Sequence, residues 1–126
     1  MPELTFGIGP RWSDHAGSAE GIGRLAARIE ALGFDAIFVG DHLSFHTPMP
    51  DPFVVLSMVA AYTKRIRLQT CVLILPFYQP FRLAHVAATL DAASGGRPAA
   101  LAAAARTPAS SRNRFALTQI PTQALP

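Results

Sequence analysis

The chain repeats one pattern, in which a short apolar segment is followed by an amphipathic one. The apolar segments begin near positions 4, 35 and 66, so the repeat is 31 residues long. Residues 4–8 form a short apolar run, and residues 36–40 are continuously apolar, which is typical of strands buried on both faces of a parallel sheet. Residues 66–75 are predicted to form the third strand, which Pro76 ends. A strand, a crossover helix and the next parallel strand need about 30 residues. The pattern therefore predicts three strand–helix units, with parallel strands and the helices outside.

The amphipathic segments carry the start and stop signals of helices. Ser18 is suited to cap the first helix, and Gly33 stands where a left-handed residue ends it. Asp51 before Pro52 gives the second helix a cap and a first-turn proline, and Pro80 opens a third, which ends at residues 94–96. The positions expected to face inward are Ile22, Leu25, Ala26, Ile29, Leu32, Phe53, Leu56, Val59, Ala60, Leu83, Ala84, Ala87 and Leu90.

The 31-residue repeat predicts a fourth strand near position 97, but the amino-acid composition changes there. Residues 98–126 hold an alanine run, four prolines and no acidic residue. Alanine favours helix over strand, so we predict at most a short helix over residues 99–105 and an irregular or disordered tail. We expect the domain to comprise residues 1–97, followed by a tail of residues 98–126 that arises from a frameshift or a premature truncation near codon 97. A complete (β/α)₈ barrel needs roughly 250 residues, whereas this chain has 126.

Composition excludes several classes of function. The net charge of +3 comes from three arginines in residues 98–126, because acids and bases balance over residues 1–97. Three dispersed arginines make a poor phosphate-binding face, so we expect no nucleic-acid partner. No signal peptide or apolar run of membrane-spanning length is seen, and the single cysteine is consistent with a reducing cytoplasm. We expect a cytoplasmic protein with no membrane partner.

Candidate functional residues follow the strands, because chemistry in such barrels lies at the carboxyl ends of the strands. Asp41 and His42 follow the second strand, and Thr70, Cys71 and Val72 lie on the third. His42 could give or take a proton near neutral pH. The alternative is that Asp41 caps a turn and His42 is an ordinary loop residue. For Cys71 the simpler interpretation is a small buried hydrophobe.

Two other candidates are weaker. Arg11 and Trp12, after the first strand, could contact a phosphate and a planar ligand, although exposed loop positions explain them equally well. The histidines and Cys71 do not have the spacing of metal ligands, so we expect no metal site.

Three segments together resemble luciferase-like monooxygenases: ALGFDAIFVGDHL (31–43), DPFVVLSMVAAYTKRIRLQTCVLILPF (51–77) and QPFRLAHVAATLDAASGGR (79–97). The likeness is greatest to the branch that uses deazaflavin, coenzyme F-420, with users of FMN as neighbours. The resemblance implies an α/β fold that is part of a TIM (β/α)₈ barrel, and hydride transfer or oxygen activation on a small-molecule substrate. It also implies that Asp41 and His42 lie near the cofactor ring as catalytic groups, and that Thr70, Cys71, Val72 and Asp41 bind the cofactor.

The resemblance further implies a cis peptide bond at Cys71–Val72. Because the later phosphate-binding loops of such a barrel are not in this chain, we expect weak or no cofactor binding and impaired activity. Two alternatives stay open. One is a non-catalytic fragment that self-associates through an exposed sheet edge, and the other is a chain that does not fold stably.

Overall fold

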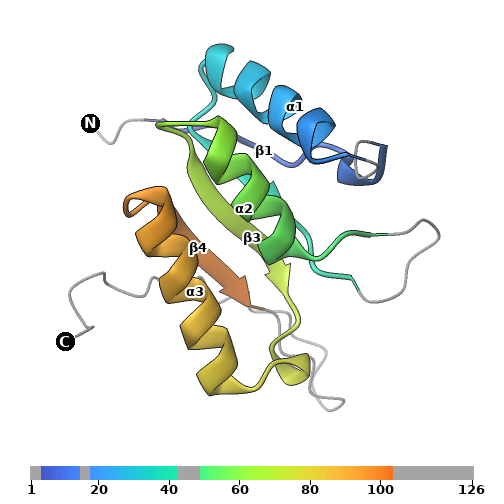
Figure 1. The fold of residues 1–126 in the computed structure, drawn as a ribbon, viewed down its shortest axis with the longest axis vertical. Coiled ribbons are helices and arrows are strands. Elements are labelled where there is room, and N and C mark those ends of the chain that lie inside the picture. Colours follow the sequence, from blue (N-terminus) through green and yellow to red (C-terminus); the bar gives the residue numbers. More distant parts are fainter. Residues whose placement is uncertain (1–3, 15–17, 43–48, 104–126) are drawn as a thin grey trace.

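The computed structural model has two layers, a four-stranded parallel sheet and three helices on one face of it (Figure 1). It describes residues 4–14, 18–42 and 49–103. The strands are β1 (Gly7–Ile8), β2 (Ala36–Val39), β3 (Arg67–Leu73) and β4 (Pro98–Ala103), and they lie in the order of the sequence. The helices are α1 (Ala19–Ala31), α2 (Pro52–Tyr62) and α3 (Pro80–Ser94), with short 3-10 turns η1 (Trp12–Asp14) and η2 (Leu75–Phe77). The predicted units of parallel strand and outer helix are confirmed.

The fourth strand is the main correction to the sequence-based prediction. β4 pairs in parallel with β3, with Gln69 opposite Ala100 and Thr70 opposite Leu101. The expectation that no strand follows Arg97, and that a helix covers residues 99–105, is therefore wrong over residues 98–103. The physical reason is that β3 offers a row of unpaired backbone groups beside the end of α3, and pairing with them outweighs the low strand propensity of alanine. The rest of the predicted tail, residues 104–126, lies outside the described residues.

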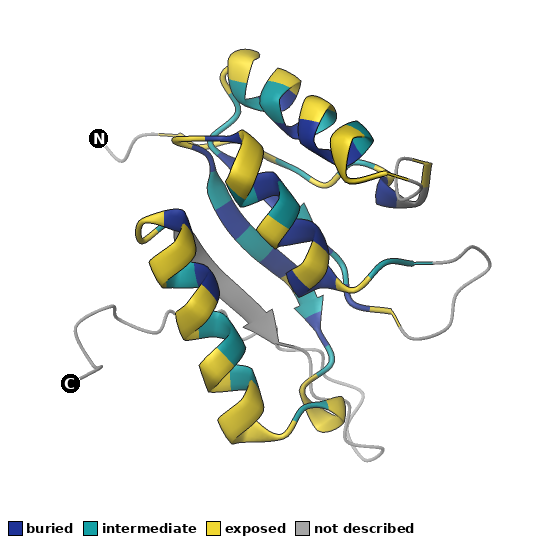
Figure 2. Ribbon diagram, viewed as in Figure 1, coloured by how far each residue is buried: buried dark blue, intermediate teal, exposed yellow. Residues whose placement is uncertain are grey.

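The hydrophobic core fills the space between the sheet and the helices (Figure 2). Ile37 and Val39 on β2 and Leu68 on β3 are at most 1% exposed, and alternation places them on the helix-covered face. Phe38 and Gln69 oppose each other on the other face, and both are only partly buried. The sheet of the described residues is thus covered on one face and open on the other.

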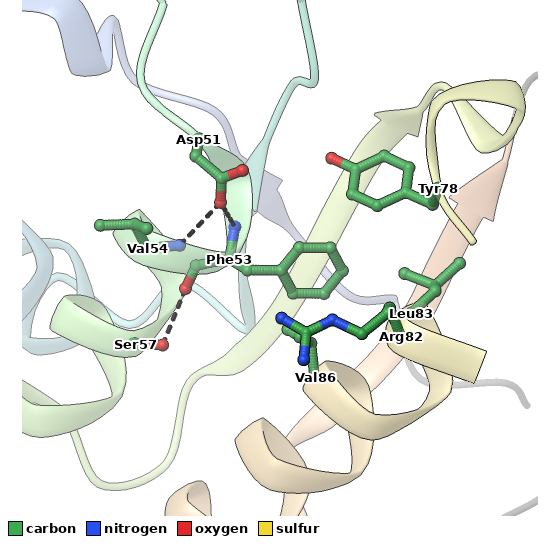
Figure 3. A pocket seen from close by; sticks show the side chains of 8 residues that line it. All are labelled: Asp51, Phe53, Val54, Ser57, Tyr78, Arg82, Leu83 and Val86. Atoms are coloured by element: carbon green, nitrogen blue, oxygen red, sulfur yellow. Dashed lines mark hydrogen bonds between the residues drawn. The ribbon is translucent and has the colours of Figure 1, made fainter. Parts of the chain in front are cut away.

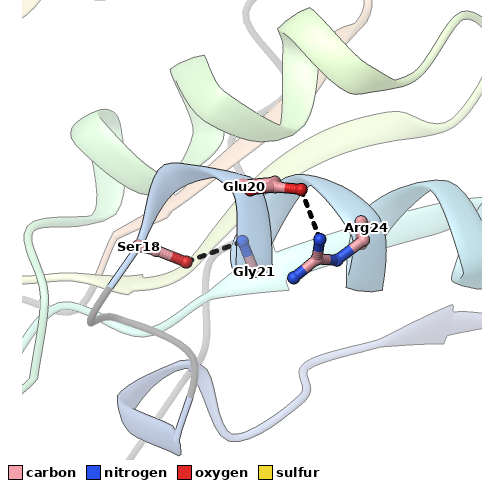
Figure 4. A network of polar contacts seen from close by, with 4 residues as sticks. All are labelled: Ser18, Glu20, Gly21 and Arg24. Atoms are coloured by element: carbon pink, nitrogen blue, oxygen red, sulfur yellow. Dashed lines mark hydrogen bonds and ion pairs between the residues drawn. The ribbon is translucent and has the colours of Figure 1, made fainter.

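Helix α1 begins and ends as its sequence predicts. The Ser18 hydroxyl accepts a hydrogen bond of 2.9 Å from the Gly21 amide, and an ion pair joins Glu20 to Arg24 one turn later (Figure 4). After the helix, Gly33 adopts a φ of 89°, a left-handed conformation that favours glycine.

The other two helices also follow their local signals. The Asp51 carboxylate accepts hydrogen bonds from the amides of Phe53 and Val54 at 2.9 and 3.0 Å and so caps α2. α3 ends at Ser94, and the glycine that follows it, Gly95, has a φ of 74°. The predicted inward positions are mostly buried or half-buried, but Leu32 and Ala84 are exposed. Leu32 lies beyond the last turn of α1, where the helix no longer directs it to the core.

Two charged side chains hold the end of the sheet at which β2, β3 and β4 begin. Glu30 at the end of α1 accepts hydrogen bonds from the amides of residues 64, 65 and 66 at 2.7–3.2 Å. Arg97 binds the ends of α2 and α3 through its guanidinium group. Both side chains therefore fix the connections that lead into β3 and β4, at the end of the sheet where the strands begin.

None of the helices in the described ranges combines the length and the apolar character needed to cross a membrane.

Candidate functional site

The candidate site lies where β2 and β3 end. β2 ends at Val39, so Asp41 and His42 both follow the strand and are not bound to its alternation of faces. Asp41 is 4% exposed, whereas His42 is exposed. The two adjacent side chains therefore occupy different environments, one in the interior and one at the surface.

The Asp41 carboxylate holds the segment that follows β3. Its Oδ2 accepts a hydrogen bond of 3.0 Å from the Ile74 amide, and its own amide donates to the Val72 carbonyl at 2.8 Å. These contacts agree with the turn-capping interpretation, and they join Asp41 to Val72 and Ile74 at the end of β3. A direct role of Asp41 in chemistry stays a prediction.

His42 folds back over the end of β2. A Cβ added to Gly40 would lie 3.3 Å from Nε2 of His42 and 3.4 Å from the Cys71 carbonyl oxygen. The imidazole and the end of β3 therefore both come close to the Gly40 backbone, and a side chain at this position would crowd them. The structure thus brings His42, Asp41 and Cys71 together, as the sequence predicts for the ends of adjacent parallel strands.

The peptide bond between Cys71 and Val72 is cis, as the family resemblance implies. The pairing of β3 with β4 is irregular between Cys71 and Leu73. Cys71 is exposed, so the expectation of a small buried hydrophobe is wrong. The reason is that Cys71 lies on the sheet face that no helix of the described residues covers.

Thr70 lies apart from these residues. It is 2% exposed and pairs with the buried Val39, which places it on the helix-covered face of the sheet. Its Oγ1 has no hydrogen-bond partner among the described residues. The structure therefore does not bring Thr70 to the surface that His42 and Cys71 share, and its assignment as a cofactor ligand stays an untested prediction.

Of the two candidates after β1, Arg11 is exposed as a loop residue would be, but Trp12 is buried. Trp12 is 2% exposed, and its indole Nε1 donates a hydrogen bond of 3.1 Å to the Phe38 carbonyl oxygen. Trp12 therefore packs against β2 as part of the core. Arg11 is exposed, and its Nε lies 3.8 Å from Oδ2 of Asp14.

Tyr78 is the residue of this region that the sequence analysis missed. It follows η2, and its ring meets that of Phe53 edge to face, with centroids 6.0 Å apart. Tyr78 is one of the residues that line a cavity of 430 Å³ between the starts of α2 and α3. Figure 3 shows these lining side chains. Burial and the neighbouring carboxylates of Asp41 and Asp51 raise the pKa of Tyr78, so its hydroxyl stays protonated. The available signal was a tyrosine between Pro76 and Pro80, near the edge where Asp41 was expected.

The described part of the chain contains no group of three or more His, Cys, Asp or Glu side chains that could hold a metal ion.

Comparison with known proteins identifies the family. A model of the luciferase-like monooxygenases matches residues 4–112, which extends past Arg97. The oxygenase component of a flavin-dependent trigonelline monooxygenase from Acinetobacter baylyi is 39% identical over 66 residues, which make up 52% of this chain and 18% of that protein.

Two solved structures are also similar. Monooxygenase RslO1 from Streptomyces bottropensis has a TM-score of 0.68 and 31% identity, and the match covers 79% of this chain and 32% of that one. The coenzyme F-420-dependent tetrahydromethanopterin reductase from Methanopyrus kandleri has a TM-score of 0.66 and 28% identity, over 78% of this chain and 26% of that one. This chain thus spans about a fifth to a third of these proteins. Because the family model matches residues 4–112, the chain belongs to the luciferase-like monooxygenases.

Proposed function

We propose that this chain forms the part of a flavin- or deazaflavin-dependent oxidoreductase site that the ends of the first strands supply. The observation that carries the proposal is the meeting of His42, Gly40 and the Cys71 carbonyl at one sheet edge, held there by the buried Asp41. The relatives named above, one flavin-dependent and one dependent on coenzyme F-420, support this class of cofactor. We propose reduced deazaflavin as the cofactor, with FMN as the alternative.

The residues present fit the ring of such a cofactor. Because Gly40 has no side chain, the His42 imidazole and the end of β3 come close together, and Cys71 is exposed beside them on the open sheet face. A reduced flavin supplies hydride transfer or oxygen activation when bound. His42 would hold or move a proton at the edge of the ring, because imidazole exchanges protons near neutral pH. Asp41 would orient the β3 end, and a small-molecule substrate would bind on the same face.

The described residues do not supply an obvious partner for the cofactor phosphate. The basic residue that follows β1, Arg11, is exposed and lies beside the acidic Asp14. We therefore propose that the chain of residues 1–126 binds the cofactor weakly and has impaired activity.

The test uses the full chain and nuclear magnetic resonance, which detects weak binding at millimolar concentrations. Reduced F-420 and reduced FMN should shift the amides of Gly40, Asp41 and Ile74, while ribose 5-phosphate should not. A dissociation constant weaker than about 10 μM would agree with an incomplete site. Micromolar or tighter binding would contradict the proposed impairment. Absence of shifts at these amides with both cofactors would contradict the proposed site.

A second candidate function is non-catalytic self-association. β1 and β4 are the edges of the described sheet, and Leu4 and Phe6, beside β1, are 75% and 59% exposed. Unpaired edges with apolar neighbours favour association between chains. Sedimentation velocity over a hundredfold range of concentration tests this, with Phe6→Asp as the variant expected to lower the sedimentation coefficient. A monomer at every concentration would exclude self-association.

A further inference from the structure

The cavity between the starts of α2 and α3 has no part in the proposed function. Its volume of 430 Å³ lies within the range of roughly 300–1,000 Å³ that is typical of small-molecule sites. Its walls belong to the helix layer, whereas His42 and Cys71 share a surface at the strand ends. We propose that this cavity binds a small aromatic carboxylate, whose ring lies among the apolar side chains and whose carboxylate is held by Arg82.

Apolar side chains form most of the cavity wall. Phe53, in the first turn of α2, and Tyr78, which follows η2, meet edge to face with ring centroids 6.0 Å apart. Leu83 and Val86, in the first two turns of α3, line the same space from the other helix (Figure 3). An aromatic body suits this wall, because a ring gains offset-stacked or edge-to-face contacts with other rings.

Besides the uncharged Tyr78 hydroxyl, the lining has three polar side chains, Asp51, Ser57 and Arg82. Two of them are already engaged within α2. The Asp51 carboxylate accepts hydrogen bonds from two amides of the first turn, at 2.9 and 3.0 Å. The Ser57 hydroxyl donates one of 2.7 Å to the Phe53 carbonyl. Arg82 is therefore the charged group of the lining whose hydrogen-bonding capacity is left for a ligand.

Arg82 has no acidic partner among the described residues, where the ion pairs join Arg11 to Asp14 and Arg24 to Glu20. Figure 3 shows its side chain extending from α3 toward the first turns of α2. A guanidinium group presents a planar fork of N–H donors that matches the two oxygens of a carboxylate. Apolar neighbours strengthen such a pair, because they lower the local dielectric constant. A carboxylate is thus the group that this side of the cavity selects.

The two charges of the lining set the direction in which the ligand lies. Asp51 stands at the N-cap of α2 and Arg82 in the first turn of α3, and no ion pair joins them. A ligand carboxylate is repelled by Asp51 and attracted by Arg82, so it lies on the α3 side. The aromatic ring then points toward Phe53 and Tyr78.

Hydrogen bonds outside the cavity hold its walls in place. The Arg97 guanidinium donates to the carbonyls of Ala60 at 2.8 Å and Ser94 at 2.7 Å, so it ties α2 and α3 together at their far ends. The Tyr78 amide donates 3.0 Å to the Leu75 carbonyl and closes the η2 turn. Walls that are fixed before binding lose little conformational freedom when a ligand enters.

The experiment titrates the full chain with phenylacetate and follows the backbone amides by nuclear magnetic resonance. We expect shifts at Val54, Ser57, Leu83 and Val86, with a dissociation constant of about 1 mM or tighter, as is ordinary for a ligand of about ten non-hydrogen atoms. The absence of shifts at these amides up to about 10 mM phenylacetate would overturn the proposal.

Four related probes separate the contribution of the charge from that of the ring. Phenylacetamide lacks the charge and phenethylamine reverses it, whereas acetate and inorganic phosphate lack the ring. Each should bind about tenfold more weakly than phenylacetate, because each loses either the charged hydrogen bonds or the apolar contacts. If any of the four binds as tightly as phenylacetate, the cavity does not select an aromatic carboxylate and the proposal is wrong.

Substitution of Arg82 tests its role directly. Arg82→Ala should weaken phenylacetate binding about tenfold, and Arg82→Lys should recover part of the loss, since it keeps the charge but not the fork. Arg28→Ala, on the exposed side of α1, is the matched control and should leave the dissociation constant unchanged. Both arginines are exposed, so the variants should fold, which circular dichroism verifies. Unchanged binding in Arg82→Ala, or an equal loss in Arg28→Ala, would refute the assignment.

This proposal and the proposed function can fail separately. Phenylacetate should leave the strand-end amides of Gly40 and Asp41 unshifted, and the reduced cofactors should leave those of Leu83 and Val86 unshifted. If the cofactors bind but phenylacetate does not, only the cavity proposal fails. If phenylacetate shifts Leu83 and Val86 while no cofactor shifts the strand ends, only the proposed function fails. Shifts by phenylacetate at Gly40 in place of Leu83 would assign the carboxylate to the strand ends and overturn the cavity site.

Discussion

Arg97 and Thr63 are joined by a hydrogen bond of 2.8 Å from Arg97 Nη1 to Thr63 Oγ1, although 34 positions separate them. The same guanidinium donates to the carbonyls of Ala60 at 2.8 Å and Ser94 at 2.7 Å. Arg97 thereby satisfies carbonyl groups at the ends of α2 and α3 and stands directly before β4. These hydrogen bonds fix Arg97, so the residues that follow it lie beside the edge of β3 and can pair with it as β4.

Arg97→Ala should lower the free energy of unfolding by about 2 kcal/mol, because three hydrogen bonds from a charged group are lost. Urea denaturation followed by the fluorescence of the single tryptophan, Trp12, measures this. Arg97→Lys should recover only part of the loss, since an ammonium group cannot reach the same acceptors with a planar fork. Arg28→Ala on the exposed side of α1 is the control, and an equal loss there would contradict a specific anchor.

Glu30 should make stability depend on acid pH. Burial by itself raises its pKa, but the backbone donors of Lys64, Arg65 and Ile66 and the charge of Arg65 outweigh it, so the pKa lies below its ordinary value of 4.5. The folded state then favours the ionised form, so its contribution is complete above pH 4.5 and is lost as the pH falls through the lowered pKa.

Glu30→Gln should lower stability at pH 7 by about 1 kcal/mol, a figure reduced for solvent exposure. The difference between the variant and the parent should shrink as the pH falls from 5 toward 3. Urea midpoints at several pH values measure it, with Glu20→Gln, on an exposed ion pair, as the control. A difference that is constant with pH would contradict the role given to Glu30.

Gly23 should tolerate no side chain, because α1 and α2 approach closely there. An added Cβ would lie 2.4 Å from Cγ and Cδ2 of Tyr62, at the base of the ring. Gly23→Ala should therefore destabilise the chain by about 1–3 kcal/mol, although alanine by itself favours a helix by up to ~1 kcal/mol. In a Tyr62→Ala background the same substitution should become neutral or stabilising. Thermal melts of the four proteins measure the coupling, and additive effects would refute the contact.

Asp51 should contribute as a helix cap. Asp51→Ala removes the acceptor of the Phe53 and Val54 amides and should cost about 1 kcal/mol. Asp51→Asn keeps an oxygen acceptor and should remain within a few tenths of a kcal/mol of the parent. Circular dichroism melts compare the two, and equal losses would mean that the charge of Asp51 matters more than the cap.

Local signals predicted the helices well because a helix end is decided by a few neighbouring residues. Ser18, Asp51 and Gly95 each act on backbone groups within three or four positions, so their roles can be read from sequence. The regularly spaced apolar segments likewise predicted the parallel strands. The meeting of Asp41, His42 and Cys71 followed from the rule that parallel strands end at one edge of a sheet.

The remaining features depend on partners that are distant in sequence. Alanine-rich residues 98–103 form a strand because β3 offers an edge, which no local propensity reveals. Thr70 and Cys71 are adjacent, yet the direction of the pleat buries one and exposes the other. Tyr78 meets the Phe53 ring only when folding brings the start of α2 beside η2.

The sequence by itself therefore determined the strand–helix repeat, the helix caps and the family, because these rest on periodicity and short-range hydrogen bonds. Only the tertiary structure decided that β4 forms and which donors the buried Asp41 carboxylate receives. Both outcomes depend on hydrogen bonds between backbone or side-chain groups that lie thirty or more residues apart in the sequence. Such groups meet only when the helices and strands pack in three dimensions.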